Sequence, residues 1–326
     1  MKSVSNLNGI IIAVTAICAS VISPSCNNDD VIIDDQPDST GQRPVTPQSS
    51  AWCDKVYEWT PAPGQFINEK TPDCDWNDKT TPAIAAQWAK NRLDKHLYVS
   101  LGSFGGYIVV GFDHSILNTG GYEIGVVGNA FNSPSGSSNE PGIVYVMQDS
   151  NNNGLPDDEW FELKGSDTFA PTTIRNYSVT YYRPEADEKA VCWIDNLGNE
   201  GEIGYLGMFH SQPSYYPVWI QPDSYTLTGT RLMDKTSQNP ETGNWQNDAF
   251  SWGYCDNMGQ DNIELDNFPN CNRFKISNAI DESGNPVNLQ YIDFVKIQTA
   301  ILASAGWLGE VSTEVLGVVD LSLIKQ

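Results

Sequence analysis

The stretch Tyr177-Ser178-Val179-Thr180-Tyr181-Tyr182 decides the fold class. Its odd positions are aromatic or aliphatic, whereas positions 178 and 180 carry small hydroxyl side chains. Successive side chains of a β-strand point to opposite faces of a sheet, so this alternation predicts a strand with one face buried and the other in solvent. Strands of this kind are typical of antiparallel sheets.

Two other stretches, residues 106–112 (GYIVVGF) and 292–297 (IDFVKI), are almost continuously apolar and predict strands that run through the interior. The helix expected is Pro82–Asp94, because Thr81 is a suitable N-cap and proline is favoured in the first helical turn. Turn signals separate the strand candidates, which are residues 97–101, 107–112, 122–128, 143–148, 160–163, 177–182, 190–194, 218–220, 225–232, 273–277, 292–299 and 315–320. The sequence therefore predicts an all-β fold, a single large jelly-roll-like β-sandwich with one short helix and long loops.

The chain of 326 residues is strongly acidic, with 41 Asp and Glu against 18 Lys and Arg and a formal net charge of -23. This balance excludes a nucleic-acid partner, because affinity for phosphate backbones comes from clustered Lys and Arg. Hydrophobic residues make up 40% of the chain and aromatic residues 11%. That is enough apolar surface to form a core, so the chain is not a disordered acidic protein.

Residues 1–25 have the pattern of a secretion signal. Lys2 precedes an apolar run at residues 10–22, which is shorter than the roughly 20 residues that span a bilayer. Ser25 places a small residue directly before Cys26, as a lipoprotein signal peptidase requires, whereas Ile17 before Cys18 is too bulky. We therefore expect Cys26 to carry the lipid. Residues 26–52 are then an acidic, Pro- and Ser-rich flexible tether, and residues 53–326 are the β-sandwich surface binding domain.

Five cysteines remain after Cys18 and Cys26 are set aside. Their spacing predicts two disulfides in an oxidising compartment, Cys53–Cys74 and Cys255–Cys271, and leaves Cys192 unpaired. Sequence spacing does not prove connectivity, so other pairings stay open.

Residues 149–160 resemble an EF-hand-type calcium loop in their spacing. Oxygen-bearing side chains occupy loop positions 1, 3 and 5, glycine occupies position 6, and a backbone carbonyl is available at position 7. Position 12 is Trp160, so the closing carboxylate comes from Asp158 or Asp157. The predicted ligands of a structural Ca²⁺ are Asp149, Asn151, Asn153, Leu155 and Asp158. The alternative is a polar hairpin turn without an ion.

Aromatic residues cluster beside Pro and Gly outside the clear strand patterns. Exposed rings of this kind bind the apolar faces of sugars or other large flat ligands, and the candidates are Tyr215, Tyr216, Trp219 and Trp252. The alternative is that these rings fill the core.

Catalytic motifs such as GxSxG, HExxH and the P-loop are missing from the sequence, and three histidines argue against a transition-metal site. A glycosidase carboxylate pair stays open, because its separation in space defines it. The carboxylates considered for such a pair are Asp113, Glu140, Asp157, Asp158, Glu159, Glu310 and Glu314. We assign no catalytic residue from the sequence.

Several segments resemble a group of bacterial secreted β-sandwich proteins usually called cell surface proteins. These segments are residues 98–116 (YVSLGSFGGYIVVGFDHSI), 125–131 (GVVGNAF), 140–144 (EPGIV), the calcium-like loop, 291–297 (YIDFVKI) and 309–315 (GEVSTEV). The acidic residues after Cys26, in CNNDDVIIDD, resemble the export signal of Bacteroidota-type surface lipoproteins. The resemblance implies a lipid-anchored protein on the surface of the outer membrane, where such proteins accompany uptake systems for glycans or corrinoids such as vitamin B12.

The function expected from the sequence is therefore capture of an extracellular nutrient, a glycan or a corrinoid, for a TonB-dependent outer-membrane transporter. This binding protein is expected to be non-enzymatic and stabilised by calcium. Two alternatives remain open at this point. One is a surface glycoside hydrolase with a carboxylate pair, and the other is a structural or adhesive cell-surface protein.

Overall fold

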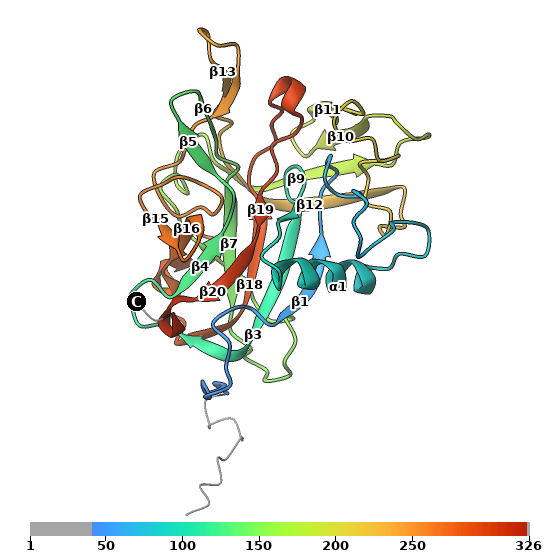
Figure 1. Cartoon of the computed structure of the whole chain (residues 1–326). Helices are drawn as coiled ribbons and strands as arrows, with labels where there is room; N and C mark the ends of the chain where they lie inside the picture. Colours follow the sequence, from blue (N-terminus) through green and yellow to red (C-terminus); the bar gives the residue numbers. More distant parts are fainter. Residues whose placement is uncertain (1–40, 325–326) are drawn as a thin grey trace, which may run out of the picture. The chain divides into compact units, whose positions relative to one another are not determined.

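The computed structural model of the protein describes residues 41–324. The expected signal peptide, Cys26 and the first part of the expected tether lie outside these residues. The described residues form several antiparallel sheets and one α-helix, which confirms the predicted all-β sandwich (Figure 1). No helix within this range has the length and apolar character that a membrane crossing requires.

A six-stranded sheet forms the centre of the fold. The two apolar stretches of the sequence are neighbours in it, with Val110 of β3 paired to Val295 of β18. Both strands are buried along most of their length, as their composition predicts. In sheet order the strands are β1 (Lys55–Thr60), β3 (Tyr107–Leu117), β18 (Tyr291–Thr299), β7 (Gly142–Met147), β8 (Phe161–Leu163) and β17 (Ala279–Ile280).

A four-stranded sheet packs on one face of the central sheet. Ile124, Val126 and Val318 from this second sheet share a core cluster with Val110 and Val295. Alternate residues point the other way, and Val127 and Val319 form a smaller cluster on the outer face. In sheet order the strands are β15 (Asn262–Leu265), β16 (Phe268–Phe274), β4 (Ile124–Val127) and β20 (Gly317–Asp320).

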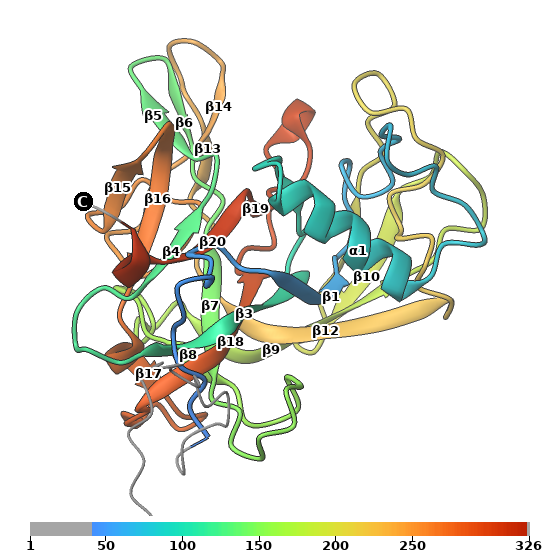
Figure 2. The same ribbon diagram turned by 60° about the horizontal axis from the view of Figure 1, so that its bottom comes forward.

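The helix α1 (Pro82–Leu93) lies beside β1 and closes one side of the core (Figure 2). The Thr81 hydroxyl accepts a 3.2 Å hydrogen bond from the backbone N–H of Ile84, so the predicted cap is present. Trp88 of α1 stacks on Trp59 of β1 with ring centroids 4.9 Å apart. The helix is thus held mainly by burial of its aromatic and alanine face.

A second four-stranded sheet carries the alternating stretch that opened the sequence analysis. Tyr177, Val179 and Tyr181 of β9 are fully buried, whereas Ser178 and Thr180 are half-exposed. The predicted half-buried antiparallel strand is therefore confirmed. In sheet order the strands are β11 (Glu200–Ile203), β10 (Val191–Asp195), β9 (Ile174–Tyr182) and β12 (Ser224–Arg231).

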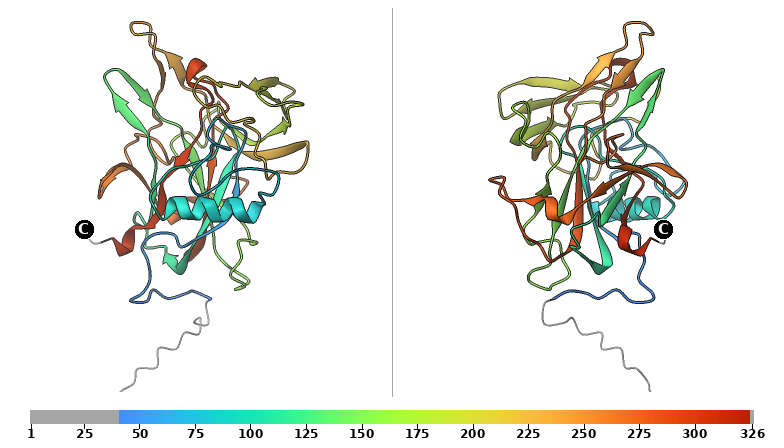
Figure 3. Two further views of the ribbon diagram at one scale, coloured as in Figure 1. Left: turned by 45° about the vertical axis from the view of Figure 1, so that its right-hand side comes forward. Right: turned by 90° about the vertical axis from the view of Figure 1, so that its left-hand side faces the viewer.

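Short elements cluster at one end of the molecule, at the top of Figure 1. Two hairpins project there together with a loop drawn in red that contains the 3₁₀ turn η2, and both views of Figure 3 show the same arrangement. The hairpin strands are rich in Ser, Asn and Gln, so the hydrophobic pattern of the sequence did not predict them as strands. The elements are β5 (Phe131–Ser133) with β6 (Gly136–Ser138), β13 (Thr236–Gln238) with β14 (Trp245–Asn247), and η2 (Gly306–Leu308), next to β2 (Val99–Ser100) paired with β19 (Glu314–Val315).

The last short elements are the 3₁₀ turns η1 (Ile276–Asn278) and η3 (Leu321–Leu323). One strand candidate was wrong. Residues 218–220 lie in a turn, where the backbone N–H of Ile220 donates to the carbonyl of Pro217 at 3.2 Å.

The predicted disulfides are also wrong, because Cys53, Cys74, Cys255 and Cys271 are free thiols. Cys53 and Cys255 are buried in the main core cluster, whereas Cys271 lies in the separate outer cluster with Val127 and Val319. Burial raises the pKa of Cys53 to about 11 and that of Cys271 to about 12. These thiols serve as small apolar core groups.

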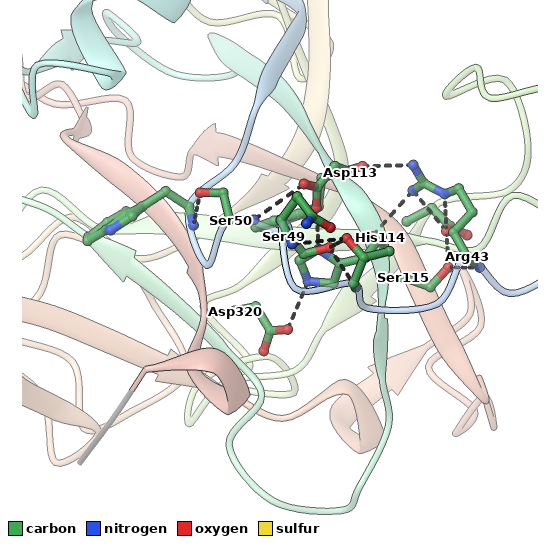
Figure 4. A network of polar contacts seen from close by, with 12 residues as sticks. Arg43, Ser49, Ser50, Asp113, His114, Ser115 and Asp320 are labelled. Atoms are coloured by element: carbon green, nitrogen blue, oxygen red, sulfur yellow. Dashed lines mark hydrogen bonds and ion pairs between the residues drawn. The ribbon is translucent and has the colours of Figure 1, made fainter. Parts of the chain in front are cut away.

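Residues 41–52, part of the expected tether, are hydrogen-bonded to the sandwich (Figure 4). The Arg43 guanidinium forms a 3.0 Å ion pair with buried Asp293, and its backbone N–H donates to Ser115. The buried imidazole of His114 lies between Asp113, at 2.6 Å, and Asp320, at 3.0 Å. The packed structure therefore begins before residue 53.

Candidate functional site

The aromatic residues singled out from the sequence do not form an exposed surface. Tyr215 and Tyr216 are fully buried, and Trp219 is 2% exposed. The Trp219 ring packs against Trp59 and Trp76 with centroids 4.8 Å and 4.9 Å apart. Trp252 is partly exposed in a separate loop. The alternative, that these rings fill the core, holds for the first three.

The predicted calcium loop joins β7 to β8 and is closed by its own side chains. The Asp149 carboxylate accepts hydrogen bonds from the backbone N–H groups of Asn153, at 3.1 Å, and Gly154, at 2.8 Å. The Asp158 carboxylate accepts one of 3.0 Å from Ser150 at the opposite end of the loop. Gly154 has φ +72, a left-handed conformation that glycine adopts without strain.

The loop residues fit a hard cation in ligand type. Within the turn, Oδ1 of Asn151 and Oδ1 of Asn153 accept backbone hydrogen bonds, and the side-chain amides of both residues donate to Asp157. Asp157 accepts hydrogen bonds from the side-chain amides of Asn151 and Asn153, which lowers the pKa of its carboxyl. Oxygen donors of this kind are those that Ca²⁺ prefers.

A cavity of about 550 Å³ lies at the end of the molecule where the two hairpins project. Its walls come from the β5–β6 hairpin, from β14, from the loop around η2 and from residues near β2. This volume lies within the range of small-molecule and cofactor sites. We call it the end pocket, and its lining residues are Gln65, Phe66, Tyr98, Asn129, Phe131, Ser133, Ser135, Gly136, Ser137, Ser138, Glu140, Asn244, Trp245, Gln246, Asn247, Ala305, Trp307, Leu308, Glu310 and Glu314.

Large apolar side chains of the end pocket are open to solvent. Phe131 and Trp307 are each 52% exposed, and Leu308 is 45% exposed. Phe66, Tyr98 and Trp245 are partly exposed on the same lining. Several exposed apolar side chains on one cavity of a folded protein indicate an interaction site.

The loop that carries Trp307 is fixed by contacts with a distant part of the chain. The Gln65 side-chain amide donates to the carbonyl of Leu308 at 2.7 Å. Gly306 has φ +58, and a Cβ there would lie 2.4 Å from Nε1 of Trp245. The glycine therefore lets the η2 loop approach β14 closely, and two aromatic walls of the end pocket are held together.

Carboxylates form the polar side of the end pocket. One ligand oxygen from each of Glu140, Asp256 and Glu314 lies within 4.8 Å of the others. Asp256 is fully buried at φ +50, and its carboxylate accepts backbone hydrogen bonds from Ala130, at 2.8 Å, and Glu314, at 2.9 Å. We call these three residues the acidic cluster. Glu140 and Glu314 line the cavity, and Asp256 lies against them.

The electrostatics of the acidic cluster favour protonation when no cation is bound. Burial raises the pKa of Glu140 well above its usual range, and the neighbouring carboxylate of Glu314 adds to the shift. Burial likewise raises the pKa values of Asp256 and Glu314. The ligand oxygens of Glu140 and Glu314 lie within 4.8 Å of each other. Like charges at this distance do not ionise together.

Glu310 adds a fourth carboxylate to the lining. Its Oε1 accepts a hydrogen bond from the backbone of Gln65, whereas its Oε2 is buried with no hydrogen-bond partner. Burial raises the pKa of Glu310 to about 8. Oδ1 of Asn247 on the same lining is also buried without a partner. Unpaired buried acceptors are uncommon in folded proteins and point to a missing partner.

Glu140, Glu310 and Glu314 were among the carboxylates left open from the sequence, and the structure brings these three to one cavity. Asp157, Asp158 and Glu159 lie in the calcium-like loop, and Asp113 contacts His114. Asp256 and the aromatic residues Phe66, Phe131, Trp245 and Trp307 were not predicted as site residues from the sequence. A signal for two of them is present, since Trp245 and Trp307 are tryptophans in otherwise polar or glycine-rich segments.

Comparison with known proteins adds no relative: no protein-family model matches the chain, and no curated protein matches it.

Proposed function

We propose that this protein is a lipoprotein of the outer-membrane surface that captures an extracellular nutrient, a glycan or a corrinoid such as vitamin B12, in the end pocket. The observation that carries the proposal is the combination of half-exposed Phe131 and Trp307 with unpaired buried acceptors on one 550 Å³ cavity.

The lining suits a large ligand with apolar faces and many polar groups. Aromatic rings pack on the apolar face of a sugar or on a flat macrocycle. Side-chain amides and serine hydroxyls donate and accept hydrogen bonds with ligand hydroxyls or amides, and they come from Gln65, Asn129, Ser133, Ser135, Ser137, Ser138, Asn244, Gln246 and Asn247.

The location and the partner belong to the same proposal. The apolar run at residues 10–22, the Ser25-Cys26 junction and the acidic residues after it support export and lipid anchoring. A protein anchored in this way delivers its ligand to a neighbouring transporter, and we propose a TonB-dependent outer-membrane transporter in that role.

A calcium ion in the loop at residues 149–158 would stabilise the fold. Asp149 is 5% exposed, and its backbone N–H donates a 2.8 Å hydrogen bond to Asp293. Asp293 also binds Arg43 and Ser115, so the loop is joined to the N-terminal contacts. An ion at this position stabilises the native state by mass action.

A specific observation favours a second function, glycoside hydrolysis. Glu140 and Glu314 face the end pocket, and burial together with their proximity raises the pKa of Glu140, as a general acid requires. Retaining glycosidases hold two carboxyl groups about 5–5.5 Å apart. Capture is preferred, because Asp256 places a third carboxylate within 4.8 Å of both, and a two-carboxylate mechanism has no use for it.

Calorimetry of the purified protein against cobalamin and a panel of oligosaccharides tests the proposal, with product analysis of each mixture. Capture predicts saturable binding of at least one compound with no change in the compound. If the wild type hydrolyses a glycan and the variants Glu140→Gln and Glu314→Gln do not, hydrolysis would be established instead. No binding to any compound would favour a structural or adhesive protein.

A further inference from the structure

We propose that the acidic cluster, Glu140, Asp256 and Glu314, binds a divalent cation of the calcium class, and that this cation coordinates ligand oxygens in the end pocket. The cation site stands on its own observations. Its role in ligand binding rests on the proposed function.

The donor set is made of oxygen alone. Three carboxylates converge with ligand atoms within 4.8 Å of one another, and Asp256 and Glu314 are 0% and 4% exposed. Carboxylates without nitrogen or sulfur donors suit Ca²⁺ and Mg²⁺ and do not suit zinc or copper. Two of these carboxylates are buried, and a divalent cation would compensate the charge of the ionised cluster.

A second observation points to a missing partner beside Asp256. Oδ1 of Asn270 is fully buried and has no hydrogen-bond partner. This atom and Oδ1 of Asp256 flank Gly128, at 2.7 Å and 2.5 Å from the position that a Cβ of Gly128 would take. The Asn270 amide nitrogen donates to Oδ1 of Asn262 at 2.7 Å, so flipping the amide would not resolve the unpaired oxygen.

A third observation concerns Glu310, which lines the same cavity as Glu140 and Glu314. Oε2 of Glu310 is buried without a partner, and Glu310 is 8% exposed on the same cavity as Glu314. An unsatisfied buried acceptor costs about 1–3 kcal/mol. A cation and the water molecules that it holds would explain both unpaired oxygens, Oδ1 of Asn270 and Oε2 of Glu310.

The position of the acidic cluster leaves the cation open to a ligand. Glu140 and Glu314 line the cavity, and Glu140 is partly exposed. Ca²⁺ takes 6–8 oxygen ligands, so three carboxylates leave positions for water or for ligand hydroxyl groups. A pair of neighbouring hydroxyls is therefore the ligand group that the cation at the acidic cluster would recognise.

The cation itself is tested first. The purified protein is stripped with a chelator, and Ca²⁺ binding is measured by equilibrium dialysis with metal analysis. Glu314→Gln should lose one bound ion relative to the wild type, whereas Asp149→Asn probes the separate loop at residues 149–158. Glutamine keeps the shape of the side chain and can still accept the hydrogen bond from the Ser312 hydroxyl.

Glu140→Gln, at a residue that is partly exposed, provides a second variant if Glu314→Gln fails to fold. Loss of one ion in either folded variant supports the site. An unchanged number of bound ions in a folded cluster variant overturns it.

The role in ligand binding is tested separately, with cobalamin and the oligosaccharide panel in Ca²⁺ and in chelator. Coordination predicts at least tenfold weaker binding in chelator and a similar loss in Glu314→Gln. Equal affinity in Ca²⁺ and in chelator overturns the coordination role, although the nutrient function stands. Binding of Ca²⁺ at the cluster with no binding of any compound leaves the cation site in place and contradicts the proposed function.

Discussion

The backbone N–H of Gln65 donates a 2.7 Å hydrogen bond to Oε1 of Glu310, although the two residues are 245 positions apart. The Gln65 side chain also donates to the carbonyl of Leu308. These contacts fix the loop that presents Trp307 to the end pocket. The loop that carries the aromatic wall is therefore held next to a buried carboxyl group.

Replacement Glu310→Gln should make stability less sensitive to pH. Burial raises the folded-state pKa of Glu310 to about 8, above the value of roughly 4.3 expected in the unfolded chain. Between these values the folded protein keeps a proton that the unfolded chain has released, so this group lowers stability as pH rises from about 4.3 to 8. In chelator at pH 8, we expect the variant to be more stable than the wild type by on the order of 1–3 kcal/mol.

Urea unfolding at pH 5 and pH 8 measures this difference. Near pH 5 the two proteins should be similar in stability, because the carboxyl group is protonated in the folded state. A variant that is less stable than the wild type at both pH values would show that the Glu310 carboxyl is ionised and stabilising in the native fold.

Replacement Trp219→Ala should destabilise the fold without a direct effect on the end pocket. Trp219 is 2% exposed and contacts Trp59 and Trp76. Removing a buried tryptophan leaves a cavity and costs about 3–5 kcal/mol. Denaturant unfolding should show this loss, and a change below about 1 kcal/mol would mean that Trp219 is not part of the core.

Thiol reagents should detect five free thiols, at positions 53, 74, 192, 255 and 271. In the native protein, exposed Cys192 should react first with a thiol reagent, followed by partly buried Cys74. The three buried thiols should react only on unfolding, because burial keeps them protonated and inaccessible. Mass spectrometry of the alkylated, non-reduced protein tests this order, and a disulfide at Cys53–Cys74 or Cys255–Cys271 would contradict it.

Features with a local cause were predictable from the sequence. Thr81 and Pro82 define the start of α1 through capping, which depends only on neighbouring residues. The alternation at residues 177–182 gave the correct buried face of β9, because the period of a strand is fixed by the backbone. The apolar stretches at residues 107–112 and 292–297 lie in β3 and β18, which pair at the centre of the core.

Features that depend on the arrangement of distant segments were not predictable. Tyr215 and Tyr216 have proline neighbours typical of exposed loops, yet their rings fill the core beside β9. The end pocket combines Gln65, Phe131, Trp245 and Glu310, which no sequence spacing relates. Asp256 has a positive φ, and its carboxylate accepts a hydrogen bond from the backbone of Glu314, neither of which is visible in residue types.

Titration calorimetry of the two aromatic wall variants, Trp245→Ala and Trp307→Ala, tests the central claim that the end pocket captures the nutrient. The titrant is the compound of the panel, cobalamin or oligosaccharide, that binds the wild type. Phe169→Ala is the matched control, because Phe169 is 66% exposed and is not part of the end-pocket lining. We expect each tryptophan variant to bind at least about tenfold more weakly, a loss of about 1.4 kcal/mol, with unchanged melting temperature. Wild-type affinity in both tryptophan variants, or an equal loss in Phe169→Ala, would contradict capture in the end pocket.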